Sequence, residues 1–211
     1  MKDKRITLGA MNHKENKDLS PSDIYVDRDF GLRATKVLPG KYFVTAENIS
    51  IVTVLGSCVA VCMRDPEKKI GGMNHFMLPM HGNGEVVGFS PSARYGAYAM
   101  EILINDLLKM GAARKNLEAK VFGAGKVLSG MNDIGESNAR FALEYLRREG
   151  IRIAAQDLGG NYPRKVHFFP ASGRVLVKLL RSQYSDAIAV ERAYGRQLDN
   201  TQVGGDVDLF E

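Results

Sequence analysis

The longest apolar run of the chain covers residues 49–63 and is almost continuously β-branched or apolar. A run of this kind is typical of a strand that is buried on both faces. A charged turn containing a proline, at 65–69, separates it from a second apolar run at 70–78. This order predicts that the two runs pair as a β-hairpin. A shorter apolar segment at 35–44, interrupted by a proline and a glycine, predicts a strand or hairpin where the folded unit begins.

Helical periodicity follows the two apolar runs. Residues 90–111 begin with a serine and a proline, suited to the N-cap and the first helical position, and end at a glycine. Residues 139–149 predict a second helix that ends at Gly150, and 185–197 predict a weak terminal helix. The Gly-rich segment 80–89 predicts an exposed loop. Further strands are predicted at 118–124, 151–158, 165–169 and 173–180.

These elements predict an α+β fold, a single layered domain in which a mixed or antiparallel sheet has helices packed on it. The length of 211 residues fits one domain with a substantial core. We assign residues 1–35 to a polar, loosely ordered extension, 36–198 to the folded domain, and 199–211 to an acidic tail.

Composition and charge narrow the class of protein. The formal net charge of +5 comes from Lys and Arg that are scattered without interleaved aromatic residues, so we expect no nucleic-acid binding. We find no signal peptide and no apolar stretch that could cross a bilayer, and we expect a cytoplasmic protein without membrane insertion. The two cysteines, Cys58 and Cys62, would lie roughly 13 Å apart on an extended strand, beyond disulfide reach. Free thiols fit a reducing compartment.

Cys58 is the first candidate for chemistry, because Gly56 and Ser57 interrupt an otherwise smooth apolar strand directly before it. Glycine permits a close approach or an unusual backbone conformation, so the strand can bend there and expose backbone N–H groups. Such groups can bind a developing oxyanion. The plainer interpretation is that Cys58 is a small buried apolar residue, and Cys62, which lacks a preceding glycine, keeps that interpretation.

A nucleophilic cysteine needs a base, and imidazole suits that role near neutral pH. Of four histidines, His75 lies on the strand that the predicted hairpin brings beside Cys58, although a lone histidine is more often structural. One His and two Cys could instead bind a metal, but the cysteine spacing is poor for a zinc site, and we expect no metal. The sequence also lacks a phosphate-binding loop and a serine-hydrolase signature.

Two segments together resemble the signature segments of the CheD family: TVLGSCVAV at 53–61, which contains Cys58, and GGMNHFMLP at 71–79, which contains His75. The separation of the two residues, 17 positions, also resembles that family. The resemblance covers roughly residues 38–180. It continues through ARYG at 93–96, KVFGAG at 120–125, Ile134-Gly135 with Asn138, and DLGG at 157–160.

This resemblance implies a CheD-like catalytic domain, in a fold similar to the catalytic domain of deamidating bacterial toxins. The implied reaction is hydrolysis of glutamine side-chain amides on methyl-accepting chemotaxis receptors through a cysteine thioester, without a cofactor and with methyl ester hydrolysis in some members. Cys58 would be the nucleophile, His75 the acid and base, and Thr53 the residue that orients or polarises His75. Gly56 and Ser57 would support the oxyanion. The implied partners are the receptors and the phosphatase CheC, with Phe122, Gly123 and the 80–89 loop as candidate partner surface.

Two other interpretations stay open at the level of sequence. A different cysteine hydrolase or amidase could use the same Cys58 and His75 on another substrate. A non-enzymatic adaptor that binds CheC or a receptor is the second, and it requires a broken Cys–His geometry.

Overall fold

The computed structural model describes residues 24–79, 91–127, 132–181 and 185–200. Ten strands and three α-helices form in this part of the chain, with one short 3-10 helix at Arg114–Asn116. The strands are β1 Ile24–Asp27, β2 Leu32–Lys36, β3 Tyr42–Thr45, β4 Ser50–Leu55, β5 Val59–Asp65, β6 Ile70–Phe76, β7 Glu118–Gly123, β8 Arg152–Leu158, β9 Arg164–Phe169 and β10 Arg174–Leu179; the helices are α1 Pro91–Lys109, α2 Asn132–Arg148 and α3 Ser185–Asn200.

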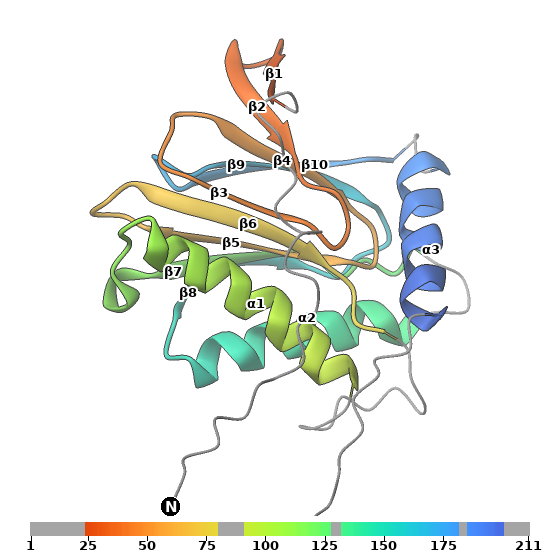
Figure 1. Ribbon diagram of the computed structural model, residues 1–211. Coiled ribbons are helices and arrows are strands. Elements are labelled where there is room, and N and C mark those ends of the chain that lie inside the picture. The colour runs from red at the N-terminus through yellow and green to blue at the C-terminus, as the bar shows by residue number, and fades with distance from the viewer. Residues whose placement is uncertain (1–23, 80–90, 128–131, 182–184, 201–211) are drawn as a thin grey trace, which may run out of the picture.

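The strands form two five-stranded sheets, in the orders β1-β2-β4-β9-β10 and β3-β6-β5-β7-β8. Both sheets are mixed, because β2 pairs with β4 and β7 pairs with β8 in parallel while the other pairs are antiparallel. In Figure 1 the sheets lie one above the other, and α1 and α2 cover the outer face of the second sheet. Helix α3 stands upright beside the two sheets. The predicted α+β class, with helices on mixed sheets in one domain, is therefore confirmed.

Strand β5 is buried on both faces because it separates two cores. Val59, Val61 and Met63 belong to the cluster that also contains α1 and α2 side chains. Ala60 and Cys62, on the opposite face, belong to the cluster between the sheets. Alternate residues of a strand point to opposite faces, so a strand in this position has to be apolar throughout.

The apolar run at 49–63 is two strands rather than the single strand that we predicted. Strand β4 belongs to the first sheet and β5 to the second, and the chain changes sheet between Leu55 and Val59. The predicted hairpin with 70–78 is confirmed for β5 and β6, in which Ala60 lies opposite His75. The change of sheet places Cys58 directly before the first residue of β5.

Three other boundaries differ from the sequence prediction. Strands β1 and β2 lie in the segment assigned to a loose extension, since β1 already begins at Ile24. Helix α2 begins at Asn132 rather than 139, and α3 continues to Asn200. The 1–23, 80–89 and 201–211 segments lie outside the described residues.

Within the described ranges, no helix is both long and apolar enough to span a membrane.

Candidate active site

Each of the three carbonyl groups of the Gly56–Ser57–Cys58 connection accepts a hydrogen bond. Gly125 N–H donates to the Gly56 carbonyl at 2.7 Å, and Ala124 N–H donates to that of Cys58 at 2.8 Å. The Ser57 carbonyl accepts from Asn138 Nδ2 at 3.0 Å. With the carbonyls engaged in this way, the N–H groups of the same three residues are available together to one acceptor.

Glu191 of α3 is that acceptor. Its Oε1 accepts from Gly56 N–H at 2.6 Å and from Cys58 N–H at 3.3 Å. Its Oε2 accepts from the Ser57 N–H at 2.7 Å and the Ser57 hydroxyl at 2.9 Å. The side chain is buried. A buried carboxylate is stable only when its oxygens are hydrogen-bonded, and these four donors meet that need.

Gly123 and Phe122, at the end of β7, lie next to this connection. Gly123 has a φ of 114°, and a Cβ placed on it would lie 2.1 Å from the Cys58 carbonyl oxygen, so only glycine fits. Phe122 is 4% exposed and packs in the core between the sheets. The Phe122 side chain is therefore covered in this state, and Gly123 is accounted for by backbone packing.

His75 is held by its backbone and by Thr53. Its N–H donates to the Lys41 carbonyl at 2.9 Å, and its own carbonyl accepts from Gly40 N–H at 2.7 Å. The Thr53 hydroxyl donates to the Val37 carbonyl at 2.7 Å and lies 2.8 Å from His75 Nδ1. A hydroxyl has one hydrogen, so at Nδ1 the Thr53 oxygen is the acceptor and Nδ1 carries the proton. Nε2 is then the basic nitrogen.

The basic nitrogen of His75 is the one that is left without a partner. Nε2 is buried and has no hydrogen-bond partner among the described residues. One ring nitrogen of His75, the Cys58 sulfur and one Glu191 oxygen lie within 4.8 Å of one another. The strand hairpin therefore brings His75 to Cys58 as the sequence predicted, and β4 of the other sheet brings Thr53 to His75.

Burial keeps both members of the pair uncharged. Desolvation raises the pKa of the Cys58 thiol well above its usual value, and the neighbouring Glu191 carboxylate, to which the thiol donates a hydrogen bond, raises it further. Desolvation lowers the pKa of His75 to about 4. Cys58 is fully buried and His75 is 1% exposed. In this state the thiol is protonated and the imidazole neutral at pH 7.

Cys58, His75 and Glu191 also have the composition of a three-ligand metal site. The contacts of Glu191 argue for a different interpretation, because both of its oxygens already accept hydrogen bonds from backbone N–H groups. A cation at this point would face the positive ends of three backbone dipoles. The cluster fits an anion, or an oxygen that becomes negative, better than a metal.

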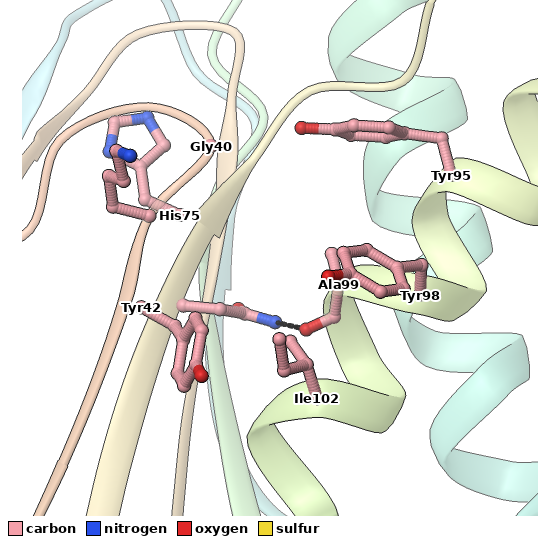
Figure 2. A pocket seen from close by; sticks show the side chains of 9 residues that line it. Gly40, Tyr42, His75, Tyr95, Tyr98, Ala99 and Ile102 are labelled. Carbon is pink, nitrogen blue, oxygen red and sulfur yellow. Dashed lines mark hydrogen bonds between the residues drawn. The ribbon is translucent and has the colours of Figure 1, made fainter. Parts of the chain in front are cut away.

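A small pocket of about 30 Å³ lies behind His75, between the β3–β6 pair and α1. Figure 2 shows Tyr42, Tyr95 and Tyr98 around it, and the hydrogen bond from Asn74 Nδ2 to the Ala99 carbonyl that ties β6 to α1. Its size leaves no room for a substrate.

Sequence reasoning missed Glu191. A signal was present, because Glu191 shares one face of the predicted terminal helix with Ile188, Tyr194 and Leu198, at helical spacing. An acidic residue within an otherwise apolar stripe is unusual, since carboxylates are rarely buried without specific partners. The sequence could have identified Glu191 as a residue with a buried partner, but not Gly56–Cys58 as that partner.

Together these groups can perform acyl transfer. A thiol, a neutral imidazole whose Nδ1–H is oriented, and backbone donors beside the sulfur are the parts that attack on an amide or ester carbonyl requires. The intact Cys–His geometry counts against the adaptor interpretation.

Comparison with known proteins gives a consistent result. The family model described as CheD chemotactic sensory transduction matches residues 77–179. A Methylobacillus flagellatus protein named "Probable chemoreceptor glutamine deamidase CheD" is 53% identical over 193 residues, which cover 90% of this chain and 95% of that protein. A Janthinobacterium relative of the same name is 53% identical over 197 residues, 92% of this chain and 97% of its own length.

Among solved structures, a Neisseria meningitidis protein of the DUF152 family has a TM-score of 0.37 and 12% identity, covering 63% of this chain and 64% of that one. That likeness is too distant to bear on function. The sequence relatives decide the family: at more than 50% identity over nine-tenths of its length, this chain belongs to the CheD family.

Proposed function

We propose that this protein hydrolyses the side-chain amide of specific glutamines on methyl-accepting chemotaxis receptors, in the cytoplasm, with Cys58 as the nucleophile. The observation that carries the proposal is the arrangement around Cys58: its thiol lies beside His75, and the N–H groups of residues 56–58 converge on one carboxylate-sized position next to it. The names of the relatives supply the substrate class.

The reaction would begin when His75 Nε2 takes the Cys58 proton and the sulfur attacks the amide carbon of the glutamine. The amide oxygen becomes negative and accepts from the N–H groups of Gly56 and Cys58, the two that now bind Glu191 Oε1. His75 then returns the proton to the departing ammonia. His75 takes a proton from the water that attacks the resulting thioester, and returns it to the sulfur as the carbon–sulfur bond breaks, which leaves glutamate and the free thiol.

Thr53 would act through His75. By accepting from Nδ1–H, its hydroxyl keeps the unprotonated nitrogen on the Cys58 side. The same chemistry would extend to the methyl ester of a receptor glutamate, with methanol as the leaving group in place of ammonia. The family resemblance adds CheC as a further proposed partner.

The proposal is tested by incubating a receptor cytoplasmic fragment with the wild-type protein, with Cys58→Ala, and with Cys62→Ala. Cys62 is the matched control because it is also buried in the core between the sheets. We expect a gain of about one dalton per converted glutamine with wild type and Cys62→Ala, and none with Cys58→Ala. Added EDTA should leave the rate unchanged, because no step uses a metal.

If wild type changes the mass of none of several cognate receptors, receptors are excluded as the substrate. The protein would then be an amidase of another substrate. Conversion by Cys58→Ala at the wild-type rate would exclude the nucleophile. Loss of activity with EDTA would favour the three-ligand metal site.

A further inference from the structure

Helix α3 presents one face to the active site. Glu191 and Leu198 on this face are buried, whereas Arg192 and Arg196, on the other side of the helix, are exposed. Between them Tyr194 packs against Gly40, where an added Cβ would meet its ring, and its hydroxyl forms a short hydrogen bond with that of Tyr95 on α1. Positions 191, 194 and 198 have the spacing of a helix that docks by one stripe.

Glu191, at the centre of this stripe, has the same side chain as the proposed reaction product. Hydrolysis of a glutamine side chain leaves a glutamate side chain beside the cysteine, and Glu191 is a glutamate side chain whose carboxylate is bonded to the N–H groups of residues 56–58. The Cys58 sulfur lies within 4.8 Å of a Glu191 oxygen. A Cβ on Gly56 would lie 2.7 Å from Glu191 Oε2, so the connection has room for the carboxyl only because residue 56 is glycine.

We propose that α3 occupies the groove in which the receptor helix docks, and that it holds Glu191 in the position of the product glutamate, so that α3 has to leave before a receptor glutamine can enter. This inference rests on the proposed receptor deamidation. It assigns the docking surface to the groove under α3 and the partner to a helix that carries a glutamine on its docking face.

The closed state follows from burial. Cys58 is fully buried and His75 is 1% exposed beneath α3, so a protein side chain cannot reach the sulfur while the helix is in place. The same contact keeps the thiol protonated, because the Glu191 carboxylate raises the pKa of Cys58 in addition to the effect of burial. Removal of α3 would relieve both effects.

The contacts that hold α3 at the site could be replaced by those of a substrate. Among the described side chains of the helix, Leu198 is the one apolar residue that is buried. Tyr194 packs partly buried against the core between the sheets. The contacts of Glu191 are polar, and a substrate carbonyl can accept from the same backbone N–H groups. An element that is held by few buried apolar contacts opens at a lower free energy than the core.

The groove extends beyond Glu191 into a cavity of about 210 Å³ that is lined by Leu38, Pro39, Leu180 and Val190, with Thr53 and His75 among its other residues. Leu38 and Val190 are each 48% exposed. This apolar margin would contact side chains that flank the glutamine, which favours a helix with apolar neighbours on its docking face.

The first test measures the access to Cys58 and needs no receptor. Wild type, Glu191→Ala and the control Glu101→Ala, an exposed glutamate on α1, are treated with iodoacetamide, and modification at Cys58 and Cys62 is followed by mass spectrometry. We expect Glu191→Ala to speed Cys58 alkylation at least about tenfold, the worth of one lost charge-assisted hydrogen bond. Cys62 should stay protected in all three, which reports that the core is folded.

The second test converts the product analogue into an internal substrate. In Glu191→Gln the introduced amide lies beside Cys58, so the enzyme should hydrolyse it and gain about one dalton at position 191. The sulfur forms the thioester, ammonia leaves with a proton from His75, and water releases the acid. The Cys58→Ala/Glu191→Gln double variant should keep its amide. Gln197, exposed on the same helix, is the internal control and should remain unchanged.

The outcomes separate the inference from the proposed function. Equal Cys58 alkylation in Glu191→Ala and wild type would overturn the closure by α3. An amide that stays intact at position 191 while receptor glutamines are converted would overturn the product position of Glu191. If Glu191→Ala frees Cys58 and the introduced amide at 191 is hydrolysed, but no receptor is deamidated, the closure stands and the receptor assignment falls.

Discussion

Replacing Thr53 by valine tests whether its hydroxyl sets the reactive form of His75. Valine has nearly the same shape, so the change removes two hydrogen bonds and little volume. The His75 Nδ1–H loses the Thr53 oxygen as an acceptor, and the Val37 carbonyl loses the Thr53 hydroxyl as a donor. Thr53, His75 and Val37 are all at most 1% exposed, so water cannot replace what is lost.

The magnitude follows from the cost of a buried group without a partner, about 1–3 kcal/mol each. His75 can avoid its share of this cost by moving the proton from Nδ1 to Nε2, but it then no longer accepts the Cys58 proton. The base-competent form would be disfavoured by the same 1–3 kcal/mol, and deamidation should slow by roughly 5- to 150-fold. Since His75 avoids its own share in this way, the unpaired Val37 carbonyl should lower the free energy of unfolding by about 1–3 kcal/mol.

Thr53→Ser is the matched control because it keeps the hydroxyl and removes only a methyl group. Deamidation of a receptor fragment is timed by mass spectrometry for wild type and both variants, and urea unfolding gives their stability. Nitrogen-15 NMR of the His75 ring reports which nitrogen carries the proton. If Thr53→Val deamidates the receptor fragment at a rate within about twofold of that of Thr53→Ser, and the proton is still on Nδ1, the tautomer argument is refuted.

Two stability predictions concern the surroundings of the same pair. Gly123→Ala should lower the free energy of unfolding by more than about 3 kcal/mol, because its Cβ would collide with the Cys58 carbonyl. The control Gly150→Ala, at a φ of 67° with no atom within 4 Å, should lower it by only about 1 kcal/mol. Equal losses for the two variants in urea unfolding would contradict the close-packing argument. Burial lowers the pKa of His75 from 6.5 to about 4, so the unfolded chain takes up a proton first on acidification. The stability that depends on neutral His75 is present above pH 6.5 and is lost as the pH falls toward 4, by about 2 kcal/mol between about pH 7 and about pH 5. His75→Gln should not show this loss of stability between about pH 7 and about pH 5. Parallel curves of unfolding free energy against pH for wild type and His75→Gln would contradict the lowered pKa of His75.

The sequence by itself determined the apolar runs, and a short turn between two of them set the pairing of β5 with β6. That register depends on local chain geometry, so the approach of His75 to Cys58 was predictable. The Gly56–Ser57 interruption also marked where the strand would change. It did not reveal that the chain crosses there to the other sheet, because period and composition are the same for strands of either sheet.

Only the tertiary structure decided what surrounds the pair. Thr53 reaches His75 from the other sheet, so its hydrogen bond depends on how the two sheets pack and not on the spacing of the residues. Gly123 is required by contact with a carbonyl that lies 65 positions earlier in the chain. Glu191 approaches Cys58 across 133 residues, through a helix whose docking face is decided by packing. Contacts at such separations leave no local pattern, because each side of the contact satisfies its own secondary structure without the other.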